Sequence, residues 1–191
     1  MIKGIIFDCF GVLVGSGFKE IYRQAGGDLA KDSVFLDDVL STANQGFISS
    51  RDMHQKVADR IGMPYNVWYD TVRKGEQPNE DLLTYIRELK QNYKIAILSN
   101  ANVGTLQRKF NPTQLALFDA LIVSAEVGMM KPNAEIYQLA AQKLGAEASE
   151  CVFTDDSEGY CEAARAIGMQ AVWYRDFSQF KAELDVILSH V

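Results

Sequence analysis

The sequence predicts an α/β fold built on a parallel sheet, with a helical segment inserted after the first strand. Short apolar runs that end in a polar residue alternate with stretches of helical periodicity over most of the chain, which is the pattern of βα units. Residues 15–76 differ, because they hold several helical patterns and no run typical of a strand. We therefore expect a core made of residues 1–14 and 77–191 and a helical domain made of residues 15–76.

Five apolar runs have the length of buried strands. They lie at residues 4–7, 94–98, 120–123, 151–153 and 170–174. Helical periodicity predicts the helices of the core at residues 79–91, 133–144, 157–167 and 177–188. Neighbouring parallel strands need crossover connections of this kind, so the predicted core has three layers, with the sheet between helices.

The inserted segment is predicted to contain four helices, at residues 18–25, 33–43, 49–61 and 65–74. Glycine-containing breaks at residues 26–27, 46 and 62–64 separate them. Trp68, Tyr69 and Val72 fit the inner face of the last helix. The polar stretch at residues 51–60, which includes His54, fits an exposed helix face.

Composition narrows the classes of partner. The chain has 19 basic and 25 acidic residues, a formal net charge of −6 and no lysine or arginine cluster, so we expect neither nucleic acid nor a membrane as a partner. A small molecule is the expected partner, and the protein is expected to be a monomer or a homodimer. The N-terminus enters an apolar strand that Asp8 soon interrupts, which does not fit a signal peptide or a membrane span.

The cysteines and histidines limit the chemistry further. Cys9, Cys151 and Cys161 form neither a C-x-x-C pair nor an even-numbered disulfide framework, so we expect free thiols and a cytoplasmic location. His54 and His190 are the only histidines, which excludes a three-histidine zinc site and disfavours a serine-histidine-aspartate triad. An enzymatic reaction would then depend on carboxylates, hydroxyls, lysine and a metal.

Polar side chains suited to catalysis follow four of the predicted strands. In chain order they are Asp8, Ser99 with Asn100, Lys131, and Asp155 with Asp156. Each has a purely structural interpretation when taken alone, as a turn residue, a helix cap or a solvated charge. However, the carboxyl ends of parallel strands share one edge of a sheet, where open α/β folds bind ligands. We therefore expect these side chains to meet at one site.

The chemistry of this set favours phosphoryl transfer. An aspartate such as Asp8 can attack phosphorus and form a covalent ester that water then hydrolyses. Ser99 can donate to an oxyanion, and Lys131, which is followed by Pro132, can neutralise an anion. The adjacent acids Asp155 and Asp156 repel one another unless a cation lies beside them, and Mg²⁺ is the hard cation that such oxygens prefer.

Four sequence motifs resemble those of the haloacid dehalogenase superfamily of aspartate-nucleophile hydrolases. They lie in the order and spacing typical of that superfamily, at residues 7–13 (FDCFGVL), 98–100 (LSN), 124–137 (from SAEVG through Lys131-Pro132 to Ile136-Tyr137) and 153–168 (from FTDDS through EAA to Gly168). The resemblance covers nearly the whole chain. It implies a Rossmann-like core with a small helical cap, at residues 15–76, that covers the site and selects substrates.

The resemblance also implies a role for each residue. Asp8 is then the nucleophile, Ser99 donates to the transferring group, and Lys131 steadies the nucleophile and the phosphoryl charge. Asn100 contacts the substrate or orders the loop. The implied cofactor is Mg²⁺, held by Asp8, the backbone carbonyl of Phe10, Asp155 and Asp156, and the implied activity is hydrolysis of a small phosphorylated metabolite of the sugar-phosphate type.

One position departs from the superfamily pattern. Phosphatases of this type usually carry a second aspartate two residues after the nucleophile, as a general acid and base, and this chain has Phe10 there. Loss of such a group costs about 10²–10⁴ in rate. Two alternatives therefore stay open, a catalytically weak relative that acts as a binding or regulatory protein and a metal-independent haloacid dehalogenase. The paired acids Asp155 and Asp156 argue against the dehalogenase, which resembles Ser-x-Asn at that point.

Overall fold

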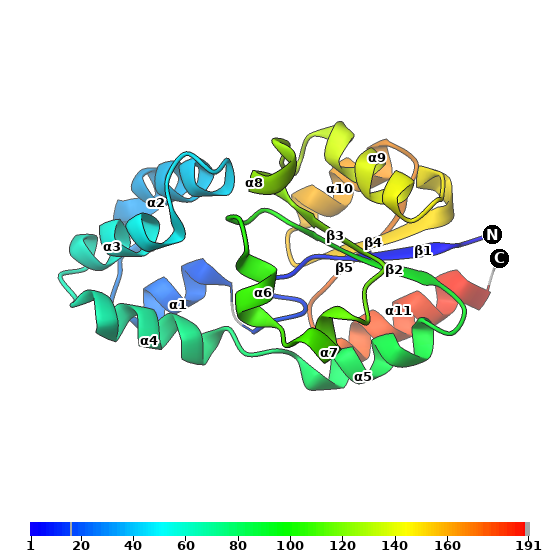
Figure 1. Cartoon of the computed structure of the whole chain (residues 1–191), viewed down its shortest axis with the longest axis horizontal. Coiled ribbons are helices and arrows are strands. Elements are labelled where there is room, and N and C mark those ends of the chain that lie inside the picture. Colours follow the sequence, from blue (N-terminus) through cyan, green and yellow to red (C-terminus); the bar gives the residue numbers. More distant parts are fainter. Residues whose placement is uncertain (16, 190–191) are drawn as a thin grey trace.

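The computed structural model describes residues 1–15 and 17–189 and shows a five-stranded parallel sheet between two layers of helices (Figure 1). The strand order is β3-β2-β1-β4-β5. The strands are β1 (Gly4–Phe7), β2 (Lys94–Ser99), β3 (Ala120–Val123), β4 (Cys151–Asp155) and β5 (Gln170–Trp173). The predicted α/β fold with a parallel sheet is confirmed. His190 lies outside the described residues.

Four longer helices cover the sheet on both faces. They are α5 (Glu80–Leu89), α9 (Ala134–Lys143), α10 (Glu158–Ala166) and α11 (Phe177–Ser189). Figure 1 shows α9 and α10 on one face of the sheet and α5 and α11 on the other. Their bounds lie within a few residues of the predicted ones, because each helix has an apolar face that repeats at helical spacing.

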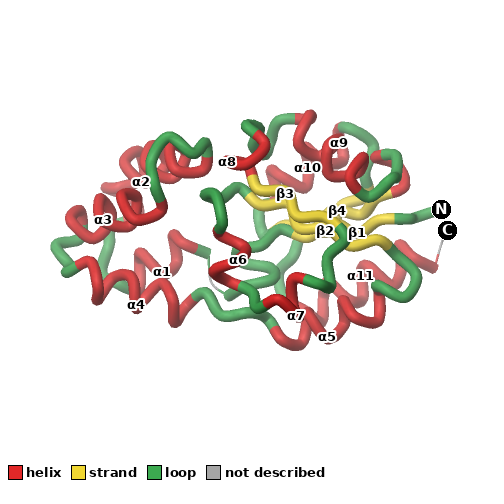
Figure 2. The backbone as a smooth tube through the Cα atoms, viewed as in Figure 1, coloured by secondary structure: helices red, strands yellow, loops and turns green. Residues whose placement is uncertain are grey.

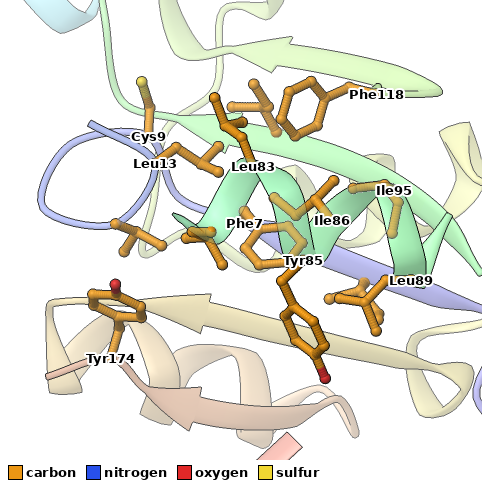
Figure 3. Packing of buried hydrophobic residues seen from close by; sticks show 14 of the residues in the cluster. Phe7, Cys9, Leu13, Leu83, Tyr85, Ile86, Leu89, Ile95, Phe118 and Tyr174 are labelled. Carbon is orange, nitrogen blue, oxygen red and sulfur yellow. The ribbon is translucent and has the colours of Figure 1, made fainter. Parts of the chain in front are cut away.

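Alternation along the strands divides the core into two apolar clusters. Ile5 and Phe7 point to the cluster shared with α5 and α11, whereas Ile6 points to the cluster shared with α9 and α10. Figure 3 shows the first cluster, in which Phe7 lies among Leu83, Ile86 and other apolar side chains. A strand with both faces buried needs a continuous apolar sequence, which is why these runs could be recognised as strands.

Short helices between the strands were not predicted. They are α6 (Thr105–Lys109), α7 (Pro112–Leu115), α8 (Ser124–Val127) and the 3-10 turn Ala148–Glu150. Each spans little more than one turn, so no apolar residue can recur often enough to show a helical period.

The helices α1 (Phe18–Gln24), α2 (Leu29–Asn44), α3 (Ser50–Arg60) and α4 (Tyr65–Gly75) lie beyond the carboxyl ends of the strands (Figures 1 and 2). They share an apolar cluster of their own, in which Trp68 and Tyr22 are fully buried. α2 begins four residues before the predicted start at Ser33. The reason is Asp28, whose carboxylate accepts hydrogen bonds from the backbone N–H groups of Ala30 and Lys31 and caps the helix earlier.

Polar contacts join these four helices to the core. The Ser124 hydroxyl donates to the backbone oxygen of Asn44 at 2.6 Å, which ties the end of α2 to the start of α8. The two connecting segments run side by side, where the N–H of Gly15 donates to the oxygen of Gln77 at 2.9 Å. Among the described residues, no helix combines the length and the apolar character that crossing a membrane requires.

Candidate active site

The first functional side chain, Asp8, follows β1 at the centre of the sheet. Its backbone N–H donates to the oxygen of Thr154 at 2.9 Å, so the neighbouring strand β4 holds its position. Gly11, with φ of +82°, lets the chain turn away from the sheet just afterwards. A Cβ atom at Gly11 would lie 2.2 Å from Oδ2 of Asp156, so the close approach of the two loops requires glycine.

Lys131 joins the predicted carboxylates into one cluster. Its Nζ donates to Oδ1 of Asp8 at 2.7 Å and also contacts Oδ2 of Asp155, and the side chain is only 1% exposed. The Asn100 amide holds the lysine backbone, since it donates to the oxygen of Lys131 and accepts from its N–H, both at 2.9 Å. The loops after β1, β2, β3 and β4 thus converge through these contacts.

The charges of this cluster shift its pKa values in a consistent way. Burial raises the pKa of Asp8 to about 7, with Lys131 opposing the shift and Asp155 adding to it. Burial and the charge of Asp155 likewise raise the pKa of Asp156 to about 6. Burial alone lowers the pKa of Lys131, but Asp8 and Asp155 outweigh it and the net pKa is raised, so the amine stays charged. The cluster therefore holds three carboxyl groups against one cation.

These residues fit a divalent metal ion. Asp8, Asp155 and Asp156 each offer a carboxylate oxygen, and the three oxygens lie within 4.8 Å of one another. No hydrogen bond from the described residues reaches the carbonyl oxygen of Phe10. Mg²⁺ prefers hard oxygen ligands of this type, and its charge would offset the excess of carboxylates.

The other two predicted residues differ in their surroundings. Ser99 ends β2 and is fully buried, and its Oγ has no hydrogen-bond partner among the described residues. It does not line the cavity above the cluster, whereas Asn100 does.

A cavity of about 290 Å³ opens above the cluster, between the sheet edge and helices α1–α4. Asp8, Lys131, Asp155 and Asp156 line it from the core. Its apolar lining comes from both regions, mainly from Phe10, Phe18, Leu40, Met53 and Tyr69. The space can hold a small molecule whose reacting group meets the carboxylates.

Several cavity residues were not recognised in the sequence. His54 is 7% exposed and lines the cavity, so the expectation that it belongs to an exposed helix face was wrong. Its Nδ1 accepts a hydrogen bond from Nε1 of Trp68 at 3.1 Å. Tyr160, Arg73 and Arg108 also line the cavity, and the Tyr160 ring lies 4.9 Å from Nζ of Lys131. No sequence signal separates such residues from other surface positions on their helices.

The fold and the cluster define a class of α/β enzymes that act on a ligand at the carboxyl edge of a parallel sheet. A family model of hydrolases matches residues 2–168. The chain belongs to that family, the haloacid dehalogenase-like hydrolases.

Three curated relatives match most of the chain. It is 28% identical to the sesquiterpene phosphatase astK of Aspergillus oryzae, over 91% of this chain and 90% of the relative. It is 24% identical to the D-ribitol-5-phosphate phosphatase of Bacteroides thetaiotaomicron, over 99% of this chain and 100% of the relative. It is 26% identical to the bifunctional epoxide hydrolase 2 of Sus scrofa, over 97% of this chain but only 39% of that longer protein.

Solved structures share the fold. A predicted haloacid dehalogenase-like hydrolase from Porphyromonas gingivalis has a TM-score of 0.76 and 23% identity, with 98% of both chains covered. A family enzyme from Bacteroides thetaiotaomicron, solved with magnesium and inorganic phosphate, has a TM-score of 0.72 and 21% identity, over 94% of this chain and 99% of that one. An L-2-haloacid dehalogenase has a TM-score of 0.66 and 19% identity, over 94% of this chain and 87% of that one.

Proposed function

We propose that this hydrolase is a Mg²⁺-dependent phosphomonoesterase that acts on a small phosphorylated metabolite through a phosphoryl group carried by Asp8. The observation that carries the proposal is the buried contact of Lys131 with both Asp8 and Asp155, beside Asp156, at one end of a cavity of about 290 Å³. The curated phosphatases among the relatives support the same reaction class.

The first step is an attack by a carboxylate oxygen of Asp8 on phosphorus. A bond forms between that oxygen and phosphorus, and the bond to the ester oxygen breaks with its electron pair left on the alkoxide. Lys131 lies 2.7 Å from Oδ1 of Asp8, so it can orient the nucleophile and neutralise the phosphoryl oxygens. Ser99 is proposed to donate to the transferring group, and the lack of a hydrogen-bond partner for its hydroxyl among the described residues supports this role.

In the second step, the oxygen of a water molecule forms a bond to phosphorus and the bond between phosphorus and the Asp8 oxygen breaks, which releases inorganic phosphate, the free Asp8 carboxylate and a proton to solvent. Mg²⁺ would be held by Asp8, Asp155, Asp156 and the Phe10 carbonyl, and when bound it would supply positive charge beside the phosphoryl oxygens. Asn100 fixes the Lys131 backbone through two hydrogen bonds and lines the cavity, so it can contact the substrate as well.

Phe10 restricts the substrates that we expect. Phe10 lines the cavity and occupies the sequence position where phosphatases of this type usually carry a general acid, and a phenyl ring cannot deliver a proton. The leaving group must then depart with little help or take its proton from solvent. Phosphate esters of acidic alcohols, such as anomeric sugar phosphates, meet this condition.

The helices of residues 15–76 are proposed to act as a cap. They have their own apolar cluster, and Phe18, Leu40 and Tyr69 place side chains from them along the cavity. The cytoplasmic location stays a prediction, for which three free and buried cysteines are the support.

A comparison of wild type with Asp8→Asn tests the function. An aryl phosphate is the right first substrate, because its good leaving group needs no general acid. We expect hydrolysis that depends on Mg²⁺ and falls by at least about 10⁴-fold in Asp8→Asn. Equal rates for the two proteins would contradict the phosphatase and favour a binding or regulatory protein. Halide release from a haloacid without metal would indicate a dehalogenase.

A further inference from the structure

The charged residues that line the cavity form two groups of opposite net charge. At the sheet edge, Asp8, Asp155 and Asp156 outnumber Lys131. The remaining charged side chains that line the cavity are three cations, Arg73, Arg108 and Lys109, and one acid, Glu76. This excess of positive charge stands out in a chain with a net charge of −6.

Only one of the three cations is neutralised. Lys109 forms an ion pair with the buried carboxylate of Glu76. Arg108 donates to two uncharged groups, the oxygen of Val103 at 3.2 Å and the Thr105 hydroxyl at 2.9 Å. Arg73 has no side-chain hydrogen bond or ion pair within the described residues. Two guanidinium groups are therefore available, and both are exposed as well as in contact with the cavity.

His54 adds an uncharged donor to the same region. Trp68 N–H can only donate, so Nδ1 of His54 must accept, and the neutral ring then carries its proton on Nε2. Burial, with Lys109 and Arg108 nearby, lowers the pKa of His54 to about 4, so the ring stays neutral near pH 7. Its Nε2–H has no partner within the described residues.

We infer that the substrate of this site carries a second anionic group, a phosphate or a carboxylate, which Arg73 and Arg108 bind with the N–H of His54. Guanidinium groups match both anions in geometry and charge. The inference rests on the proposed function, because it places the reacting phosphoryl group at Asp8 and the second anion at these three side chains. Apolar residues such as Phe10 and Tyr69 line the same cavity.

Calorimetric titration with ligands that cannot be hydrolysed tests the inference. The three probes are n-butylphosphonate, the same chain with a second terminal phosphonate, and the same chain with a terminal carboxylate, each titrated with Mg²⁺ near pH 7. We expect one or both doubly anionic probes to bind at least about tenfold more tightly than n-butylphosphonate. Whichever of them binds more tightly identifies the second anion as phosphate-like or carboxylate.

Variants link that preference to the two arginines. Arg73→Gln and Arg108→Gln should each lower the affinity ratio between the doubly and singly anionic probes by about fivefold or more. Lys74→Gln is the matched control, since it removes the same charge from the next position of α4 and does not line the cavity. Because both probes are measured on one protein, the ratio does not depend on the fraction that is folded.

Three results would overturn the inference: equal affinity for all three probes or binding of none, a ratio that the arginine variants leave unchanged, or tighter binding of a decylphosphonate than of either doubly anionic probe. The last result would indicate an apolar substrate. Failure of the proposed function is distinguishable. An absence of phosphatase activity that depends on Asp8, with the affinity ratio intact, would refute the reaction and leave the second anion site.

Discussion

The sheet edge and the helical wall of the cavity, formed by the residues of α3, α4 and α6 that line it, are built in different ways. At the edge, four loops bring together buried side chains whose charges contact one another, as Lys131 does with Asp8 and Asp155. On the wall, Arg73 and Arg108 project from helices, stay exposed and have no charged partner within the described residues. Buried charges that form ion pairs hold atoms in place for a reaction, whereas exposed charges without a charged partner are available to bind a ligand.

Removal of the buried lysine should have the largest effect on stability. Lys131→Met leaves Asp8 and Asp155 buried without their cation, so the free energy of unfolding in the presence of a chelator should fall by about 3–5 kcal/mol. Urea denaturation measures this loss, and added Mg²⁺ should restore part of it. Lys19→Met is the control from the helical region, because it breaks only the exposed pair with Asp37 and should change little. Similar curves for the two variants would contradict the difference between the regions.

The buried histidine of the wall should make stability depend on pH. Its pKa is lowered from 6.5 to about 4, so the unfolded chain binds the proton more readily in that interval. The contribution of His54 is therefore complete above about pH 6.5 and is lost as the pH falls towards about 4. Between about pH 7 and about pH 5, wild type should lose about 2 kcal/mol more than His54→Gln, whose amide oxygen can still accept from Trp68.

Urea denaturation at a series of pH values measures that difference. Lys56→Gln, an exposed change on the same helix α3, should follow the wild-type curve. Parallel curves for wild type and His54→Gln would show that the ring is not shielded from protonation as its burial implies.

A helix cap in the helical region should have the smallest effect. Asp28→Ala removes the carboxylate that accepts from Ala30 and Lys31, and should lower the free energy of unfolding by about 1 kcal/mol. The same substitution within α2, Asp38→Ala, lies on an exposed face and should be neutral or slightly stabilising, since alanine favours helix. Thermal or urea unfolding of both variants gives the comparison, and equal losses would mean that Asp28 does not act as a cap.

Prediction from sequence succeeded for features that follow from a single physical rule. Buried parallel strands need continuous apolar runs, so all five strands were located. Asp8, Asp155 and Asp156 could be expected to lie together, because the carboxyl ends of parallel strands share an edge. The start of α2 was placed late because the capping role of Asp28 depends on the local turn as well as on the residue type.

The sequence by itself determined the fold class, the strands and the edge where polar side chains gather, since these follow from local periodicity and from the geometry of parallel sheets. Only the tertiary structure decided which carboxylates Lys131 contacts, that His54 is buried against Trp68, and that Arg73 and Arg108 line the same cavity as Asp8. The physical reason is that those contacts join residues far apart in the chain. The positions of His54 and Arg73 depend on how helices α1–α4 pack against one another and over the sheet edge, and those of Lys131 and Arg108 depend on how the loops and α6 pack at that edge, which no local pattern encodes.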